Sequence, residues 1–462
     1  TDLAGAIDTI GMVRFIADTN PGTRALFPRN PGAELARRLG NGGAQVFQAT
    51  IGGNTPQYLV NHFAAQLASG EAGVVLLAGA ELLATMFDAF RSGADLSGWP
   101  GEAAQEPATL GVERDGTTHI ETTHGLYEPI NTYPLFENSL RHHLGNSREE
   151  HSARIAELCS GMSRVAADNP LAWRSVFESA EVISTVERRN RYIGFPYTRA
   201  MNPILEVDMA AALVMTTAGR ARELGIDESR WVYLRGGVDV HDTWFVSERE
   251  SLHASPAIRG AWGALSAHSG LSVDDVGLFD IYSCFPSAVE VACNEIGLDC
   301  LDPRGVTVTG GLPYFGGPGN NYSLHAIAEM AGRLRGRDRA HGLVTANGMY
   351  LTKHSLGLYS TEPPGAAWAP IDSAPVQAEV DAAPQCTVAT DPAGPATIET
   401  WTVGYDREGP KRGIVIARNA AGERVVANTP DDEATLRAMI EDDPIGTQGE
   451  VSVEEGLHIL RL

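Results

Sequence analysis

A short glycine-rich turn that occurs twice constrains the fold of this chain more than any other feature. One copy covers residues 309–322, where five of the fourteen residues are glycine. Glycine is used where φ is positive or where another group must approach the backbone closely. The other copy, Gly52-Gly53-Asn54, also stands between a strand pattern and a helix pattern. One such turn is consistent with an ordinary structural turn, but two of them indicate two related halves that pack together.

The residues around the turns predict the elements of each half. In the first half, strand patterns at 10–15, 46–50 and 74–81 alternate with helix patterns at 31–39 and 56–67. In the second half, strand patterns at 230–240, 276–281, 306–308 and 342–346 alternate with helix patterns at 255–270 and 323–334. The small apolar residues of 207–224 predict a further helix. Continuous apolar strands between helices predict an α/β fold with buried sheets.

Shifts in composition divide the chain into six segments. We expect the first half of the fold at 1–114 and 201–240, the second half at 241–362, and at 115–200 an insertion with a helix at 148–167. A linker at 363–376 contains Pro and Gly. Short strand patterns then follow at 386–390, 397–405, 413–418 and 424–427, with a helix at 433–441 and more strand to the end of the chain. Residues 377–462 therefore predict an additional small β-barrel domain, for which the OB-fold is the commonest candidate.

Composition excludes several classes of partner. The net charge of −23 argues against nucleic acid, and the acidic runs at 430–433 and 441–443 give the C-terminal domain a scaffold or lid role instead. No apolar run reaches the roughly 18 residues of a membrane span, so no membrane contact is expected. The five cysteines are scattered and odd in number, which fits neither a disulfide framework nor a metal site. A cytoplasmic location and no bound metal are therefore expected.

Residues 1 to about 360 resemble the thiolase superfamily in four motifs that occur in the family's order. Residues 77–81, Leu-Ala-Gly-Ala-Glu, are similar to the stretch that follows the thiolase nucleophile. Residues 280–285, Asp-Ile-Tyr-Ser-Cys-Phe, are similar to the Asn-Glu-Ala-Phe motif or to its His-Asp-Cys-Phe variant in sterol-carrier-type thiolases. Residues 310–318 resemble Gly-Gly-x4-Gly-His-Pro, and Asn347-Gly348 falls on the Cys-x-Gly motif.

The resemblance implies the thiolase fold, in which two βαβαβ halves form α/β/α/β/α layers. The C-terminal β domain points to thiolase-like proteins that carry an additional domain there. The resemblance also implies that the first strand and helix of the fold are absent upstream of Thr1.

The four catalytic positions of the family have all changed. Gly53, Tyr282, Gly317 and Asn347 stand where thiolases have their nucleophilic Cys, an Asn, a His and a second Cys. Glycine has no side chain to act as nucleophile or base, so ordinary thiolase activity is predicted to be absent. The resemblance implies CoA or acyl-CoA as a ligand, with no permanently bound cofactor. The expected acyl-CoA pocket comprises Gly52, Gly53, Asn54, Tyr314, Gly316, Gly317, Pro318, Gly319, Asn320 and Gly348.

Three side chains are candidates for other chemistry. Tyr282 ends a buried strand, and a tyrosine acts as an acid/base only if its pKa falls from about 10. His354 is a candidate base, and its alternative is a hydrogen-bonded structural histidine. Cys284 is a candidate thiol, and its alternative is a small buried hydrophobic residue.

Residues 282–285, Tyr-Ser-Cys-Phe, also resemble the motif of thiolase-like aldolases of steroid side-chain breakdown, which act with an OB-fold partner protein. Those aldolases carry a second tyrosine at the position of Gly317, which Tyr314 or Tyr322 would replace here. Arg188, Arg189 and Arg191 are candidates for contacting CoA phosphates, with a solvated basic face as the alternative.

Three functions follow from the resemblance. The first is an acyl-CoA- or CoA-binding protein of lipid metabolism, nominally an acetyl-CoA acetyltransferase-like acyltransferase. The second is a retro-aldol lyase that cleaves a β-hydroxyacyl-CoA with Tyr282 as acid/base. The third is a non-catalytic subunit. Whether the chain is an enzyme stays open at this point, and both a homodimer and a monomer are expected alternatives.

Overall fold

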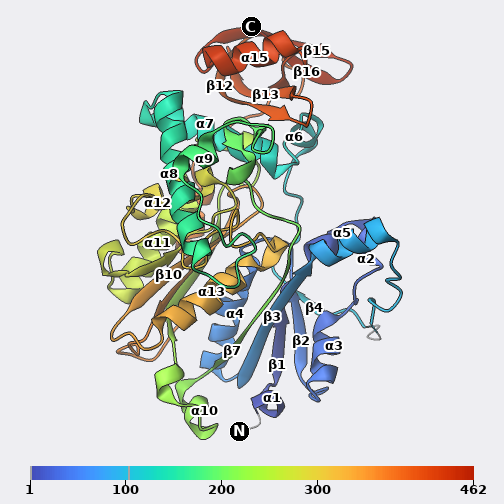
Figure 1. The fold of residues 1–462 in the computed structure, drawn as a ribbon. Helices are drawn as coiled ribbons and strands as arrows, with labels where there is room; N and C mark the ends of the chain where they lie inside the picture. The colour runs from blue at the N-terminus through green and yellow to red at the C-terminus, as the bar shows by residue number, and fades with distance from the viewer. Residues whose placement is uncertain (1–2, 102–104) are drawn as a thin grey trace.

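The computed structural model describes residues 3–101 and 105–462 (Figure 1). The first half contains a sheet with the strand order β4-β2-β1-β3-β7. Strand β1 (Thr9–Met12) lies parallel to β2 (Gln45–Ala49) and to β3 (Val74–Leu82), and β2 lies parallel to β4 (Ala108–Leu110). Strand β7 (Asp208–Thr216) runs antiparallel to β3. The helices of this half are α3 (Pro31–Arg38), α4 (Thr55–Ser69) and α5 (Leu83–Ser92), with the shorter α1 (Leu3–Ala6) and α2 (Pro21–Arg24).

The second half contains a sheet with the order β8-β11-β10-β9. Its strands are β8 (Tyr233–His241), β9 (Leu278–Asp280), β10 (His341–Gly348) and β11 (Lys353–Ser360). Its helices are α11 (Pro256–Ser269), α12 (Pro286–Ile296) and α13 (Tyr322–Leu334). Helices α4 and α13 contact each other and both sheets. The predicted layered thiolase fold is therefore confirmed, with these two helices as its central layer.

Two predicted elements of this core are wrong. Residues 207–224 form β7 followed by the short helix α10 (Ala218–Glu223), because this small-residue run pairs with the whole length of β3. Residues 306–308 form no strand among the described residues. The backbone N–H groups of Val308 and Thr309 bind the carboxylate of Asp280 instead of a neighbouring strand.

The insertion forms helices that lie between the second half and the C-terminal domain (Figure 1). They are α6 (His119–Thr123), α7 (Pro129–Leu144), α8 (Arg148–Ala167) and α9 (Ala180–Ser184). Helices α7 and α8 contact α12 of the second half, and α7 also contacts β12 of the C-terminal domain. Two short strands, β5 (Tyr192–Gly194) and β6 (Tyr197–Thr198), extend the sheet of that domain.

The C-terminal domain is a small barrel, as predicted. Its strands are β12 (Gly394–Tyr405), β13 (Pro410–Asn419), β14 (Arg424–Asn428), β15 (Gln448–Glu454) and β16 (Leu457–Arg461), with the helix α15 (Glu433–Asp442). Strand β12 pairs with both β13 and β15, which closes the sheet around the buried Trp401. The predicted strand at 386–390 is wrong, because only an isolated bridge between Val388 and Arg424 forms there.

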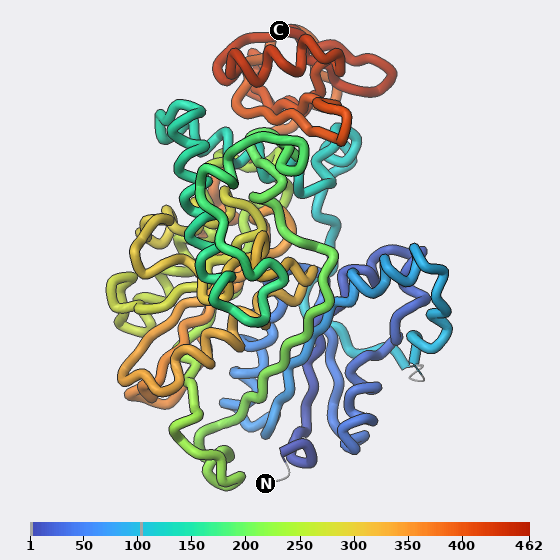
Figure 2. The backbone as a smooth tube through the Cα atoms, in the orientation of Figure 1, coloured from blue at the N-terminus to red at the C-terminus, as the bar shows by residue number. Residues whose placement is uncertain are grey.

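A further helix, α14 (Ala374–Asp381), precedes the barrel and contacts α11 and β8 of the second half. The described ends of the chain lie at opposite ends of the molecule (Figure 2). In the described part of the chain, no helix has the length and apolar character needed to cross a membrane.

Candidate functional site

The two glycine-rich turns meet at the centre of the molecule. The backbone N–H of Gly52 donates to Oδ1 of Asn320 at 3.0 Å. The hydroxyl of Ser323 donates to the carbonyl oxygen of Gly53 at 2.7 Å. These contacts join the N-terminal ends of α4 and α13, which is where the resemblance placed the catalytic groups.

Tyr282 occupies the place of a side chain at position 53. A Cβ atom on Gly53 would lie 2.1 Å from the hydroxyl oxygen of Tyr282 and 2.6 Å from the carbonyl oxygen of Asn347. Tyr282 follows β9 and is 7% exposed, and its backbone N–H donates to Oγ1 of Thr345. The glycine at position 53 therefore allows the phenol to reach the N-terminal end of α4.

The other glycines of the turns also admit neighbouring groups. A Cβ atom on Gly317 would lie 3.1 Å from the carbonyl oxygen of Ile204, and one on Gly316 would lie 2.7 Å from the sulfur of Met209. At Gly319, where φ is +47°, it would lie 2.5 Å from a carboxylate oxygen of Glu81. In this structure the expected pocket residues are thus packed closely and leave little open space.

A small internal cavity of about 10 Å³ lies beside Tyr282, which is room for about one water molecule. Helices α11 and α12 and strands β10 and β11 surround it. Two of the predicted catalytic residues, Tyr282 and His354, line this cavity together with Thr345 and Asn347. The structure therefore brings these two candidates to one place.

Asp242 fixes the orientation of His354. Nε2 of His354 lies 3.1 Å from Oδ2 of Asp242 and 3.1 Å from the carbonyl oxygen of Leu351. Because both partners only accept, Nε2 carries the proton and Nδ1 is left as an acceptor. Asp242 also accepts from the hydroxyl of Ser255 and the N–H of Ala257. Burial alone would raise the pKa of Asp242, but hydrogen bonds from His354 and Ser255 and the charge of Arg249 hold it below its usual value.

Burial keeps the phenol and the nearby thiol protonated. It raises the pKa of Tyr282 well above the usual value, with a smaller contribution from Cys284. It likewise raises the pKa of Cys284 to about 12. The thiol lies 3.8 Å from Nδ2 of Asn347, which also donates to the hydroxyl of Tyr133 at 2.9 Å. A thiol with a raised pKa is a poor nucleophile, so Cys284 lacks the microenvironment of a reactive cysteine.

The remaining candidates lie outside this cluster. The hydroxyl of Tyr322 binds Asp280 and Thr309, although its ring packs edge-on against that of Tyr282 with centroids 5.5 Å apart. The hydroxyl of Tyr314 is buried beside the thiol of Cys159. Arg188 and Arg189 are exposed on the insertion, and Arg191 donates to the carbonyl oxygen of Tyr192.

Two polar residues at this site, Asp242 and Lys353, stand in no motif of the sequence. Asp242 follows β8 directly, and a carboxylate at the end of a buried strand was the available signal. Lys353 begins β11 beside His354, and its amine donates to the carbonyl oxygen of Ile51 in the first glycine turn.

A buried polar cluster joins α7, α8 and α12 through Glu137, His151 and Glu290. Nε2 of His151 lies 2.5 Å from Oε1 of Glu137 and 3.7 Å from Oε2 of Glu290. Imidazole nitrogens and carboxylate oxygens grouped in this way can also be ligands of a metal ion. Arg154, however, donates to Glu290 at 2.9 Å, and burial raises the pKa of both Glu137 and Glu290, so protonated carboxyl groups and the guanidinium stabilise the cluster without an ion. We assign this cluster a structural role.

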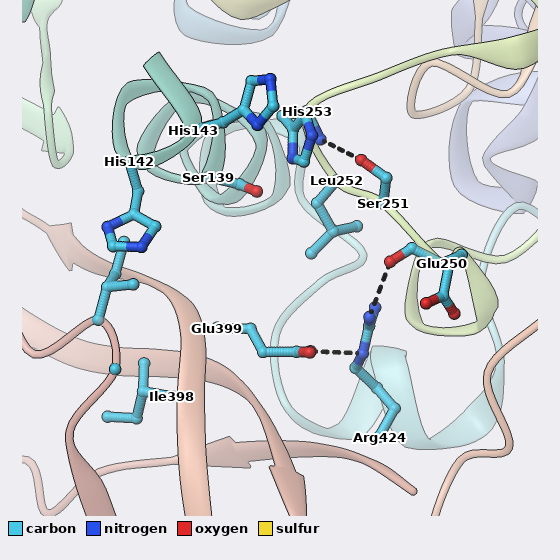
Figure 3. Close-up of a pocket in the computed structure, with 12 residues that line it drawn as sticks. Ser139, His142, His143, Glu250, Ser251, Leu252, His253, Ile398, Glu399 and Arg424 are labelled. Carbon is cyan, nitrogen blue, oxygen red and sulfur yellow. Dashed lines mark hydrogen bonds and ion pairs between the residues drawn. The ribbon is translucent and has the colours of Figure 1, made fainter. Parts of the chain in front are cut away.

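A second cavity, of about 330 Å³, lies between the barrel, α7 and the segment before α11 (Figure 3). The rings of His143 and His253 stack there with centroids 3.9 Å apart. Arg424 is 1% exposed and donates to the carbonyl oxygens of Arg249 and Glu250. Its charge also pairs with Glu399 at 2.8 Å. This cavity marks the contact between the domains and lies apart from the Tyr282 cavity, with which it shares no lining residue.

Comparisons with known proteins agree with this architecture. Residues 375–456 match the family model described as the thiolase-like protein type 1 additional C-terminal domain. A monomeric SCP2-thiolase-like protein type 1 from Mycobacterium smegmatis is 37% identical, with a TM-score of 0.84 over 100% of this chain and 90% of that chain. The peroxisomal thiolase of Saccharomyces cerevisiae, at 12% identity, shares the fold with a TM-score of 0.54 over 78% of this chain and 85% of its own.

Two similar proteins carry names of lyases. The 17-hydroxy-3-oxo-4-pregnene-20-carboxyl-CoA lyase of Mycobacterium tuberculosis is 26% identical in an alignment of 348 residues that covers 71% of this chain and 81% of that protein. A structure named the Ltp2-ChsH2(DUF35) aldolase is 20% identical, with a TM-score of 0.58 over 77% of this chain and 87% of its own. The match to the Mycobacterium smegmatis protein, which extends over the whole of this chain, and the match of residues 375–456 to the family model show that the chain belongs to the SCP2-thiolase-like proteins of type 1, in the thiolase superfamily.

Proposed function

We propose that this protein is a lyase that cleaves a carbon–carbon bond of a β-hydroxyacyl-CoA by a retro-aldol reaction. The observation that carries the proposal is the position of Tyr282, whose hydroxyl stands where a side chain of residue 53 would be. It lines one cavity with His354, which Asp242 orients. Glycine at positions 53 and 317 leaves no thiol or imidazole there for thiolase chemistry.

The two side chains divide the proton transfers between them. Because Asp242 holds the Nε2 proton of His354, Nδ1 is the nitrogen that accepts a proton. Burial raises the pKa of Tyr282 instead of lowering it as acid/base chemistry was expected to require, so the phenol stays protonated and can serve only as a proton donor, not as a base. His354 is therefore the base and Tyr282 is the acid.

The proton transfers and the bond cleavage then follow one another. Nδ1 of His354 takes the proton of the β-hydroxyl group, and the oxygen forms a carbonyl as the bond between Cα and Cβ breaks. The electron pair of that bond moves into the thioester as an enolate. The hydroxyl of Tyr282 stabilises the enolate and gives Cα its proton, and the imidazolium returns a proton to the phenolate. The products are a ketone or aldehyde and a shortened acyl-CoA.

The similar proteins support this reaction class over simple acyl-CoA binding. The name of the Mycobacterium tuberculosis relative describes a lyase for a hydroxylated steroid CoA ester, and the similar solved structure is named an aldolase. We therefore propose a hydroxylated lipid or steroid CoA ester as the substrate. The cavity of about 10 Å³ is too small for such an acyl group, so the side chains around Tyr282 move when it binds.

The test is to incubate the purified protein with β-hydroxyacyl-CoA esters, one with a short chain and one with a steroid ring at the β-carbon. Ketone and shortened acyl-CoA are quantified by mass spectrometry. We expect cleavage by the wild type and a loss of about 100-fold or more in Tyr282→Phe. Tyr405→Phe, in the barrel, is the matched control and should keep the full rate. Binding of both esters without cleavage would instead support an acyl-CoA-binding protein, and an unchanged rate in Y282F would exclude Tyr282 as the acid.

A further inference from the structure

Only two lysines occur in the 462 residues, and they differ sharply in environment. Lys411 lies exposed on β13, where its amine pairs with Glu408 and Asp406. Lys353 is 9% exposed and lies at the meeting point of the two halves. The chain uses arginine for nearly all its positive charge, so a primary amine inside the protein is a distinctive group.

The amine of Lys353 lies against the first glycine turn. Lys353 pairs with Gly348 at the ends of β11 and β10. Its Nζ donates to the carbonyl oxygen of Ile51 and would lie 2.8 Å from a Cβ atom on Gly52. The next residue, Gly53, is the position that carries the nucleophile in thiolases. The structure thus places an amine beside the turn that has lost its thiol.

The polar groups around this amine are incompletely paired. Lys353 forms no ion pair among the described residues. Oδ1 of Asn54 is buried without a hydrogen bond and would lie 2.5 Å from the same Cβ point on Gly52. Helix α4 also begins without a side-chain cap. An amine, an unpaired acceptor and an uncapped helix end therefore surround one point on the Gly52-Gly53 turn.

We propose that Lys353 is an acyl acceptor, whose amine takes an acyl group from a thioester that binds at the Gly52-Gly53 turn when the side chains packed against this turn move aside. The nitrogen lone pair attacks the thioester carbonyl carbon, the N–C bond forms and the C–S bond breaks. The thiol leaves with the proton that the nitrogen loses, and a lysine amide remains. The inference rests on the proposed function only in using the same thioester site, because it requires no cleavage of a carbon–carbon bond.

The surroundings of Lys353 suit this step. Burial lowers the pKa of Lys353 to about 8, so a useful fraction of the amine is neutral near pH 8. The dipole of α4, whose N-terminal end lies next to this turn, favours negative charge on the thioester oxygen. Because an amide is stable, each chain accepts one acyl group, and the acylated side chain then blocks the turn.

The two lysines make the test an internal comparison. The wild-type protein is incubated at pH 8 with acetyl-CoA and, separately, with S-acetyl-N-acetylcysteamine, a thioester without the CoA nucleotide. Digestion after arginine and mass spectrometry then report the acetylation of Lys353 and Lys411. We expect Lys353 to react at least about tenfold faster than Lys411 and its rate to rise between pH 7 and 9. In urea, where the site is unfolded, the two lysines should react at similar rates.

The outcomes separate this inference from the proposed lyase activity. Acetylation of Lys353 without cleavage of any β-hydroxyacyl-CoA leaves the inference standing and removes the lyase. Cleavage with no acetyl group on Lys353, or with Lys411 reacting as fast as Lys353, overturns the inference and leaves the lyase. The variant Lys411→Arg leaves Lys353 as the only lysine and should keep the whole modification.

Discussion

The hydroxyl oxygen of Tyr282 lies 2.1 Å from the point where a Cβ atom on Gly53 would stand. A side chain on residue 53 and the phenol of Tyr282 therefore cannot occupy this space at the same time. The carbonyl oxygen of Asn347, at 2.6 Å from the same point, narrows the space further. The phenol of a residue from the second half thus occupies the space that a side chain at position 53, in the first half, would need.

Gly53→Ala should destabilise the protein by about 1–3 kcal/mol or more, because the new methyl group overlaps Tyr282 and the Asn347 backbone. Urea unfolding measures the change. Tyr282→Ala in the same chain should remove only part of the added cost, since the backbone oxygen stays. The control is Gly263→Ala in α11, where no atom lies within 4 Å of the added Cβ and alanine favours the helix. Equal effects at the two glycines would contradict the contact.

Asp242→Asn should lower cleavage of a β-hydroxyacyl-CoA by about 10- to 100-fold, because the neutral amide lacks the charge that stabilises the Nε2 proton of His354 and can turn its NH2 group towards that nitrogen. Asp242 is a positioning residue, so the pH dependence of kcat/KM is the decisive readout. The fall of kcat/KM towards low pH, which reports the base in the free enzyme, should occur at a different pH in this variant. A lower rate with an unchanged pH profile would indicate only a structural role for the bonds of Asp242 to Ser255 and Ala257.

Glu290→Gln should flatten the pH dependence of stability between about pH 4.5 and 8. Burial, followed by the charge of Glu137, raises the pKa of Glu290 to about 8 in the folded protein. The folded state thus holds a proton that the unfolded state releases above about pH 4.5. Its contribution to stability is complete below that pH and is lost as the pH rises towards 8. The measurement is the unfolding free energy of the wild type and of the variant at pH 5 and pH 8. An equal change between these two pH values in both proteins would contradict the prediction.

The stacked imidazoles in the cavity between the domains predict the opposite dependence (Figure 3). Burial, with a smaller effect of His143, lowers the pKa of His253. Folding therefore favours the neutral ring, and its contribution to stability is lost as the pH falls below about 6.5. Between pH 7 and pH 5.5, the melting temperature of His253→Gln should fall less than that of the wild type. His142→Gln, an exposed histidine in the same cavity, is the control and should follow the wild type.

The protein should sediment as a monomer of about 49 kDa. The relative from Mycobacterium smegmatis, which this chain matches over its whole length, is described as monomeric. Sedimentation velocity at increasing concentration checks the mass, and a stable species of twice that mass would contradict the expectation.

The regular elements could be predicted where their sequence signals are local. Helix α8 spans the predicted residues 148–167 because a capping box of Ser147 and Glu150 marks its start. The apolar run from Val74 to Leu77 identifies β3 in the same way. Strand β7 was missed because its small residues show no clear period, and only pairing with β3 makes it a strand.

The candidate site shows the same difference between local sequence signals and contacts between distant segments. The motif at 280–285 singled out Tyr282, and the loss of thiolase chemistry that the two glycines indicate stays a prediction. The roles of Asp242 and Lys353 could not be predicted, because each depends on a partner from a distant segment: His354 for the carboxylate, and Ile51 and Gly52 for the amine.

The sequence alone determined the layered α/β fold, its additional barrel and the absence of side chains at positions 53 and 317. These properties follow from local periodicity and from residue type. Only the tertiary structure decided what fills the space above Gly53, which side chain binds His354 and where the single buried amine lies. Those properties arise from contacts between the two halves, and such contacts exist only once the central helices bring the two glycine turns together.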